Sequence, residues 1–299
     1  MLRASTKSPS EYHERVTAFI DILGFSERVR ETANSAADIA GIASALAQDV
    51  QGNPDDRRAV TVYDSGGGPN VVAWKEDIVA TESIDFCQST FSDNIVMSTK
   101  HNRRAVGHLC DHAQLMMRRL MEQGLLCRGG ITVGPLVHDR RKGVVFGPAL
   151  LEAVTLEAQV ADYPRVVVSA RMANLLSTRD NNEPSLTRYF ARCDDGMYMV
   201  DPFADYAVMR ERIEQAKLSG EPYLNEVFEE HGFPYYQGEA EFIRKGLVKA
   251  VERSMGTPRH YRKVAWFVEY FNKQVAAPAV AGLLFVDKIR LTEQGWRVL

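Results

Sequence analysis

Two aspartates occupy settings in which a carboxylate needs a partner. Asp21 interrupts the apolar run VTAFIDILGFSERV, residues 16–29, which otherwise has the pattern of a buried strand. An ionised carboxylate is costly to bury unless a pairing charge or a metal offsets that cost. Asp93 lies in FSDN, where Ser, Asp and Asn are typical of a tight turn. The two carboxylates are therefore candidates for one shared site.

A divalent cation would explain both aspartates. In the expected strand order, the end of the first strand and the FSDN turn can be adjacent, and two carboxylates there would repel each other without a cation. Mg²⁺ and Mn²⁺ prefer oxygen ligands, and Mg²⁺ often completes its shell with substrate phosphates. Gly24 follows in LGFS, where a helix start would present backbone N–H groups suited to a phosphate chain. The alternatives are a core arginine or a turn cap for Asp21, and an ordinary turn role for Asp93.

The elements that must position these residues follow from hydrophobic periodicity. We expect one antiparallel sheet backed by helices, an α+β fold of the ferredoxin-like β-α-β-β-α-β pattern. Ser26 is the expected N-cap of the first helix, and Gly124 is the expected C-cap of the second. The glycine-rich run SGGGPN, in the turn-rich segment 51–70, is not a phosphate loop because no Lys-Ser/Thr follows it. The expected elements are a strand at 15–25, a helix at 26–50, a short β-like run at 58–64, two strands within 82–100, a helix at 103–124, a hairpin at 125–148, a helix at 149–160 and a strand at 165–169.

The chain divides into three parts by sequence character. Residues 1–14 are polar and predict a flexible N-terminus, and residues 15–203 carry the expected catalytic domain. Residues 204–299 are mainly helical in pattern, including PYLNEVFEEHG, with AGLLFVDKIRL at 281–291 a candidate terminal strand. No Pro/Ser-rich linker separates this third part, so we expect an extension packed on the core rather than a free domain.

Composition excludes several classes of protein. The 299 residues are 45% hydrophobic with a net charge of −3, which gives no reason to expect nucleic-acid binding. The four single cysteines lack metal-ligand spacing and predict reduced core residues, namely Cys87, Cys110, Cys127 and Cys193. We find no signal peptide and no membrane-spanning window, and therefore expect a soluble, cytoplasmic protein with no membrane partner.

Four motifs together resemble the catalytic domain of the class III nucleotidyl cyclases. They are FIDILGFS (19–26), FSDNIV with Ser92 where the family commonly has Gly, RGGITVGP (128–135) and FGPALLEA (146–153). They stand in the family's order over about 190 residues. Together with YPRVVVS, they look most like the uridylate and cytidylate cyclases of the bacterial Pycsar antiphage system.

The resemblance implies a reaction and its machinery. A nucleoside triphosphate, UTP by preference, would be cyclised to a 3′,5′-cyclic monophosphate with release of pyrophosphate. Asp21, Asp93 and the carbonyl of Ile22 would hold two divalent metal ions, Mn²⁺ or Mg²⁺. The N–H groups of Gly24, Phe25 and Ser26 would hold the triphosphate, and the enzyme would be a homodimer with composite active sites.

The chain departs from the family at its base-reading and transition-state positions. Ser89 and Val144 stand where purine cyclases read the base, and Leu151 and Thr155 where the family has its catalytic asparagine and arginine. Another cation is then needed, and the candidates are Arg128, Arg140, Arg141 and Lys142. The alternative for Arg128 is a purely structural role, and the alternative for the DRRKG segment is an ordinary solvated hairpin tip. His138 is interpreted as a surface or packing residue rather than as a general base.

These departures leave several functions open. The preferred reading is a uridylate cyclase that makes cyclic UMP as a signal in antiphage defence, with a cytidylate cyclase next. An atypical purine cyclase is a further enzymatic alternative. A catalytically dead nucleotide-sensing or dimerisation module competes from another class, because two catalytic residues of the family are absent.

Overall fold

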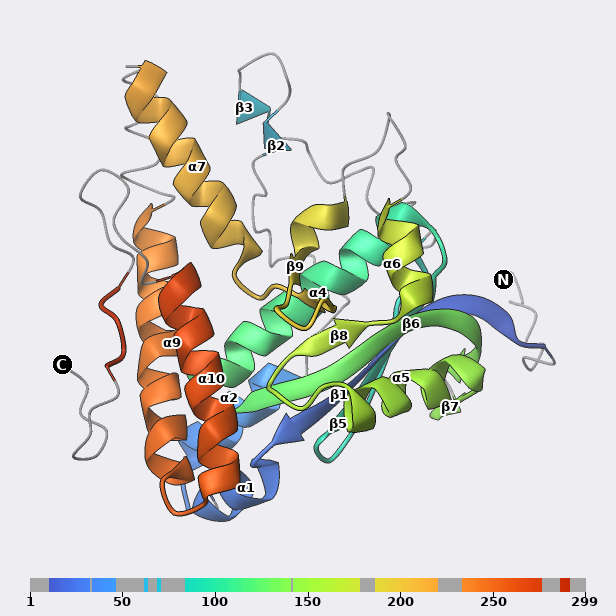
Figure 1. The fold of residues 1–299 in the computed structure, drawn as a ribbon. Helices are drawn as coiled ribbons and strands as arrows, with labels where there is room; N and C mark the ends of the chain where they lie inside the picture. Colours follow the sequence, from blue (N-terminus) through green and yellow to red (C-terminus); the bar gives the residue numbers. More distant parts are fainter. Residues whose placement is uncertain are drawn as a thin grey trace, which may run out of the picture.

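The protein is an α+β fold in which helices flank one large sheet (Figure 1). The computed structural model describes residues 11–32, 34–46, 62–63, 69–70, 84–140, 142–177, 186–219, 233–275 and 286–290. The strands are β1 (His13–Leu23), β2 (Val62–Tyr63), β3 (Pro69–Asn70), β4 (Cys87–Phe91), β5 (Asn94–Lys100), β6 (Leu126–Asp139), β7 (Val144–Phe146), β8 (Val166–Val168), β9 (Phe190–Arg192) and β10 (Tyr198–Val200). The helices are α1 (Phe25–Thr32), α2 (Ala36–Leu46), α4 (Arg103–Glu122), α5 (Pro148–Gln159), α6 (Ala170–Ser177), α7 (Ala204–Ser219), α9 (Phe233–Ser254) and α10 (Pro258–Gln274), with a 3₁₀ turn at Leu186–Tyr189.

The sheet has the strand order β4-β5-β1-β6-β8-β10-β9, with β7 paired to β6. The expected α+β class is confirmed, and β1 lies between β5 and β6 as expected for a central first strand. The pairing is antiparallel except between β6 and β8, which run parallel because α5 connects them as a crossover. The short strands β9 and β10 extend the sheet beyond the predicted elements.

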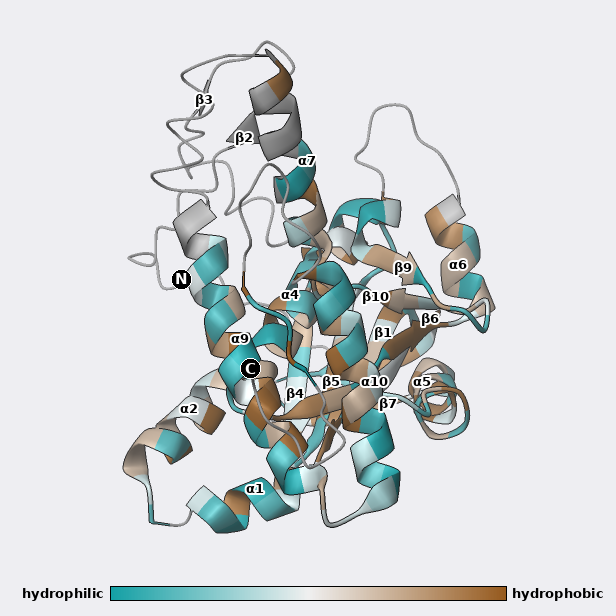
Figure 2. Ribbon diagram, turned by 60° about the vertical axis from the view of Figure 1, so that its left-hand side comes forward, coloured by the Kyte–Doolittle hydropathy of each residue, from teal (hydrophilic) through white to brown (hydrophobic). Residues whose placement is uncertain are grey.

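The two faces of β1 differ in chemistry because successive side chains point to opposite sides of a sheet. Val16, Ala18 and Ile20 are fully buried on one face and belong to the main hydrophobic core with α4, α9 and α10. Phe19 and Asp21 project from the other face, on which α5 packs across Gly130. Figure 2 shows the hydrophobic colour concentrated on the strands and on the inner sides of the helices.

Helix α4 confirms the apolar face predicted for residues 103–124. Asn102 caps its start by accepting a hydrogen bond from the Ala105 N–H at 2.9 Å. At its end Gly124 has φ +70°, and the amides of Gly124 and Leu125 bond to the carbonyls of Met121 and Leu120. This is the Schellman arrangement, which turns the chain sharply into β6. The predicted face is buried throughout: Val106, Leu109, Cys110, Ala113, Met116, Met117 and Leu120.

The helix predicted at 26–50 is wrong in its start and its continuity. It begins at Phe25, and the Arg28 N–H donates to the Gly24 carbonyl at 3.1 Å, so Gly24 rather than Ser26 is the N-cap. The segment forms two helices, with Ser35 before α2 accepting a hydrogen bond from the Asp38 amide. Ser and Asp compete for backbone hydrogen bonds and so favour caps over helix interiors.

The C-terminal third packs on the core through α4. A Cβ placed on Gly246 of α9 would lie 1.8 Å from the Met121 carbonyl, so only glycine permits this close approach. The candidate strand at 281–291 is wrong for residues 286–290, because the Asn272 side chain bonds both backbone groups of Ile289 at 2.8 Å. The predicted helix PYLNEVFEEHG lies outside the described residues. Among the described helices, none has the length and apolarity to cross a membrane.

The turn between β4 and β5 supports a first prediction. Ser92 has φ +56°, a left-handed conformation that costs a residue with a Cβ about 1–3 kcal/mol. Replacement of Ser92 by Gly removes that strain, which stabilises the fold, but it also adds chain entropy to the unfolded state, which opposes this gain. Because relief of the strain is the larger effect, we expect the free energy of unfolding to rise by roughly 1 kcal/mol. Urea denaturation measures it.

Thr90→Gly on the exposed part of β4 is the control. It should lower the free energy of unfolding by roughly 0.5–1 kcal/mol, because glycine weakens a strand. Equal losses in the two variants would contradict the strain at Ser92.

Candidate functional site

The end of β1 brings Asp21 and Asp93 together. Asp21 pairs in register with Asn94 of β5, and the Ile22 N–H donates to the Asp93 carbonyl at 2.8 Å. The Asn94 side-chain amide donates to Asp93 Oδ1 at 3.0 Å. Backbone bonding therefore fixes the hairpin turn against β1, directly beside the Asp21 carboxylate.

Arg128 is the immediate charge partner of Asp21. The two residues face each other across the β1–β6 ladder, and Arg128 Nε lies 3.2 Å from Asp21 Oδ2. The same Nε lies 2.6 Å from Glu157 Oε1 on α5. Arg128 therefore has the structural role that was considered as an alternative for it: its guanidinium compensates two carboxylates on the polar face of the sheet.

The donor set fits a divalent cation. Arg128 is shared by the carboxylates of Asp21 and Glu157, and the Asp93 turn is bonded to the adjacent backbone of Ile22. Arg128 engages Asp21 through Oδ2, while Asn94 holds Asp93 through Oδ1. Mg²⁺ commonly takes one or two protein carboxylates and fills its shell with phosphate and water. Within the described part of the chain, no cluster of three or more His, Cys, Asp or Glu forms a site built from protein ligands alone.

Glu157 was missed by the sequence analysis, and burial determines its chemistry. Its side chain is 8% exposed, and burial raises its pKa while the charge of Arg128 opposes that rise. A signal was present, because Ala149, Ala153 and Glu157 recur every four residues on one helix face. That face is buried, so a glutamate there needs a partner.

The predicted triphosphate turn lies at the junction of β1 and α1. Gly24 has φ +74°, which glycine adopts without strain, and Phe25 and Ser26 form the first turn of α1. The free N–H groups of a helix start are suited to an anion, although Glu27 also lies in this turn. The imidazole of His260 on α10 lies against Gly24, 3.4 Å from where a Cβ would stand.

The two base-recognition candidates lie on different strands, Ser89 on β4 and Val144 on β7. Ser89 is half-buried, and its Oγ lies 3.0 Å from His138 Nε2. His138 Nδ1 lies 2.8 Å from Ser98 Oγ, which also accepts from Arg15 Nε at 3.0 Å. Because Ser98 is fully buried, its hydroxyl hydrogen needs an acceptor, and His138 Nδ1 supplies it. Nε2 then carries the proton toward Ser89, so His138 does not act as a base on that serine. Val144 on β7 is 41% exposed.

The remaining candidates are dispersed. Arg140 and Lys142 are exposed at the hairpin tip, and Arg141 lies outside the described residues. Leu151 is 70% exposed on α5, and the Thr155 hydroxyl donates to the Leu151 carbonyl. Cys87, Cys110 and Cys127 are buried as expected, whereas Cys193 is only half-buried, and all four thiols are free.

Comparisons with known proteins return only distant structural likenesses. No protein-family model and no curated protein matches the chain. It is similar to the monomeric guanylyl cyclase domain of the RhoGC fusion protein of the aquatic fungus Blastocladiella emersonii, with 14% identity, a TM-score of 0.34, and 64% of this chain and 96% of that one covered. It is also similar to the guanylyl cyclase Cya2, with 10% identity, a TM-score of 0.33, and coverage of 63% and 92%. The contacts of the site, rather than these likenesses, carry the proposal that follows.

The half-buried His138, in contact with Ser89 and Ser98, generates a second prediction. Burial lowers the pKa of His138 from 6.5 to about 4, helped by the charges of Arg15 and Arg140. Below pH 6.5 the unfolded chain takes up a proton that the fold excludes, so this contribution to stability is lost as the pH falls toward 4. His138→Gln should reduce the acid sensitivity of the free energy of unfolding by up to about 1.4 kcal/mol per pH unit.

Guanidinium denaturation at pH 7 and at pH 5 measures this difference between variant and parent. His108 and His112, whose pKa values burial also lowers, are unchanged in both proteins and cancel. Exposed His101→Gln is the control and should match the parent. An identical pH dependence in His138→Gln would contradict a buried neutral imidazole.

Proposed function

We propose that the protein is a nucleotidyl cyclase that converts UTP to 3′,5′-cyclic UMP and pyrophosphate. The observation that carries the proposal is the 2.8 Å bond from the Ile22 N–H to the Asp93 carbonyl. It supports the proposal because it joins the backbone of the Asp93 turn to the strand end that carries Asp21 and leads into Gly24. Carboxylates to hold cations and N–H groups to hold phosphate would then belong to one strand end, and a metal–nucleotide complex requires both.

The proposed roles follow from this placement. Asp21, Asp93 and the Ile22 carbonyl would hold two divalent ions, Mn²⁺ or Mg²⁺. Such ions, when bound, lower the pKa of the ribose 3′-hydroxyl and neutralise phosphate charge. The N–H groups of Gly24, Phe25 and Ser26 would hold the phosphate chain. In-line attack of the 3′-oxygen on the α-phosphorus forms the new ester bond as the bond to pyrophosphate breaks, so catalysis is mainly positioning and charge stabilisation.

The choice of base rests on the residues at the reading positions. Neither Ser89 nor Val144 offers the charged contact that the resemblance leads one to expect for a purine. In the tautomer inferred above from the burial of Ser98, His138 donates to Ser89 across a 3.0 Å contact. The serine hydroxyl hydrogen is then available to an acceptor such as O4 of uracil. Cytosine presents an amino donor at that position, so CTP is the second substrate and a purine triphosphate the third.

The Asp21–Arg128 ion pair supports one alternative function. A guanidinium on Asp21 Oδ2 already compensates that carboxylate. If it stays there with nucleotide present, the chain binds nucleotides without turnover, as a sensing or dimerisation module. Arg128 otherwise remains a candidate cation for the transition state, together with Arg141.

A second copy of the chain is part of the proposal. Large apolar side chains are exposed on elements around the polar face of the sheet: Phe91 is 83% exposed, Leu151 70% and Phe146 46%. Exposed apolar side chains of this size are candidates for an interaction surface when they form a contiguous patch. A homodimer with composite sites would cover them, and the proposed cellular role is that of a cytoplasmic signal generator in bacterial antiphage defence.

The aspartate pair provides the central test. Purified protein is incubated with Mn²⁺ and each radiolabelled nucleoside triphosphate in turn, and cyclic products are separated by chromatography. We expect cyclic UMP, and a loss on the order of a hundredfold or more in Asp21→Ala and Asp93→Ala, because each removes a ligand that stabilises the reacting charges.

Asp194→Ala in the exposed β9–β10 turn is the matched control and should keep full activity. Dominant cyclic AMP or cyclic GMP would select the purine alternative, and dominant cyclic CMP the cytidylate alternative. Nucleotide binding without any cyclic product would select the sensing module.

The dimer has its own test. Leu151→Asp introduces a charge into the proposed interface and should shift the protein toward monomer in sedimentation velocity, with loss of turnover. Leu218→Asp on α7, where the side chain is 88% exposed, is the matched control and should sediment like the parent. Dimers that persist unchanged in Leu151→Asp would place the interface elsewhere.

A further inference from the structure

The first turns of α10 carry a charge pattern that disfavours the helix itself. The sequence PRHYRK puts Arg259, Arg262 and Lys263 there, with no acidic residue in the first turn. Cations near a helix N-terminus oppose the helix dipole, and Arg259 and Lys263 repel each other at spacing i, i+4. Figure 2 shows the start of α10 mainly in hydrophilic colours. A bound anion would compensate the pattern.

Two contacts fix this part of α10 beside the candidate site. His260 lies against Gly24 of the proposed phosphate turn. Six residues further along the helix, Trp266 stacks on Tyr163, with ring centroids 5.0 Å apart and an interplanar angle of 23°. Tyr163 belongs to the connection between α5, which carries Glu157, and β8. A small pocket lies beside the turn, lined in part by Gly24, Glu27, Arg253, His260 and Val264.

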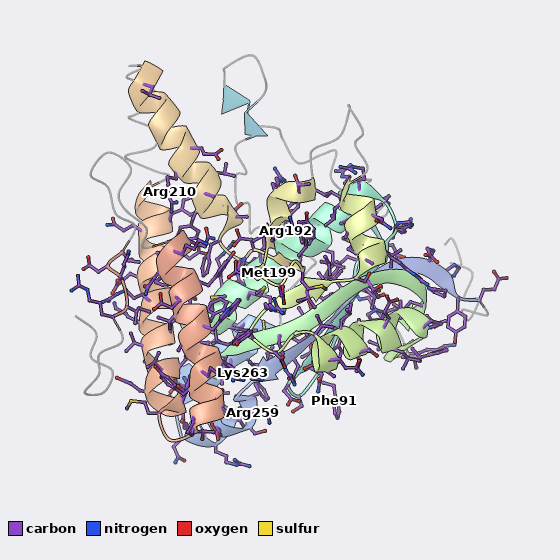
Figure 3. All side chains as sticks on the ribbon, viewed as in Figure 1. Phe91, Arg192, Met199, Arg210, Arg259 and Lys263 are labelled. Atoms are coloured by element: carbon purple, nitrogen blue, oxygen red, sulfur yellow. The ribbon has the colours of Figure 1, made fainter. Side chains whose placement is uncertain are left out.

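Lys263 extends this basic stretch to the charged cluster of the site. Its side chain is half-buried and interacts electrostatically with Arg128, Arg259 and Glu157. Burial, together with the two arginines, lowers its pKa. Within the described part of the chain, no ion pair closer than 4 Å holds Lys263 in place. Figure 3 shows Arg259 and Lys263 on the same edge of α10, near the end of the sheet where Phe91 marks the β4–β5 turn.

We propose that Lys263 and Arg259 of α10 bind the phosphate chain of the nucleotide, so that the C-terminal extension supplies cations in addition to Arg128 of the core. The inference rests on the proposed function and deepens it. Thr155 stands where the resemblance implies a transition-state arginine, and its hydroxyl is engaged with a carbonyl of its own helix. Lys263 approaches the cluster of Asp21, Arg128 and Glu157 from α10, whereas Glu157 belongs to α5. A lysine there stabilises negative charge that accumulates on the departing pyrophosphate.

A binding measurement that requires no turnover tests the assignment. Inorganic tripolyphosphate, in buffer with Mg²⁺, is titrated into the full-length protein by isothermal titration calorimetry. We expect Lys263→Met to weaken binding by about tenfold or more and Arg259→Met to weaken it in the same direction, because each removes a charge-assisted contact. Lys263→Arg should retain most of the affinity.

Lys273→Met, at the exposed C-terminal end of the same helix, is the matched control and should bind like the parent. Thermal unfolding verifies that each variant is folded, and exposed Arg259 gives a second test if Lys263→Met is unstable. Equal affinities in Lys263→Met and Lys273→Met, or no binding by the parent, would overturn the inference.

The same variants separate this inference from the proposed cyclase activity. Tripolyphosphate binding that depends on Lys263, without any cyclic product from UTP, would support the phosphate site while removing the cyclase proposal. Cyclic UMP formation that is equal in Lys263→Met and in the parent would support the cyclase proposal while removing the phosphate site on α10.

Discussion

The structure depends on how one carboxylate is accommodated in its central strand. The Asp21 side chain is 21% exposed, on a strand whose alternate residues are fully buried. It is tolerated because Arg128, in register on β6, lies within ion-pair distance and is shared with Glu157 on α5. Breaking a buried pair by removing one member leaves the other charge uncompensated, which is strongly destabilising. The residues proposed for chemistry therefore also hold the polar face of the sheet and α5 together.

Three distant parts of the sequence converge on this strand end. The β4–β5 turn is held by a backbone bond to Ile22, the α1 start is set by the positive φ of Gly24, and α10 reaches the same place through His260. Only the first two lie within residues 15–203, the segment expected to form the catalytic domain. The third arrives through α9, whose Gly246 permits close packing on the end of α4. Geometry at the candidate site is thus coupled to the packing of the C-terminal extension.

The sequence predicted much of this arrangement for identifiable reasons. The apolar run of β1 and the apolar face of α4 predicted both elements, and the FSDN turn predicted the hairpin that carries Asp93. The pairing of Asp21 with Arg128 was left as an alternative, because local pattern does not fix which charge faces a carboxylate across a ladder. The break after Thr32 was missed since helical spacing continues through it, and capping by Ser35 decides the outcome. The approach of α10 to Gly24 is a tertiary contact between residues far apart in sequence, which no periodicity reveals.

The alternation of β1 also bears on how the chain reaches its fold. If β1 slipped by one residue against β5 and β6, every side chain would exchange faces. Asp21 would then enter the dry layer beside α4, while Ile20 would be transferred to the polar side. The slipped sheet would carry an unpaired ion in its interior, so it is disfavoured far more than a slip between purely apolar strands. Asp21 thereby acts as a register marker during assembly of the sheet, and single-residue insertions or deletions within β1 should be among the least tolerated changes in the molecule.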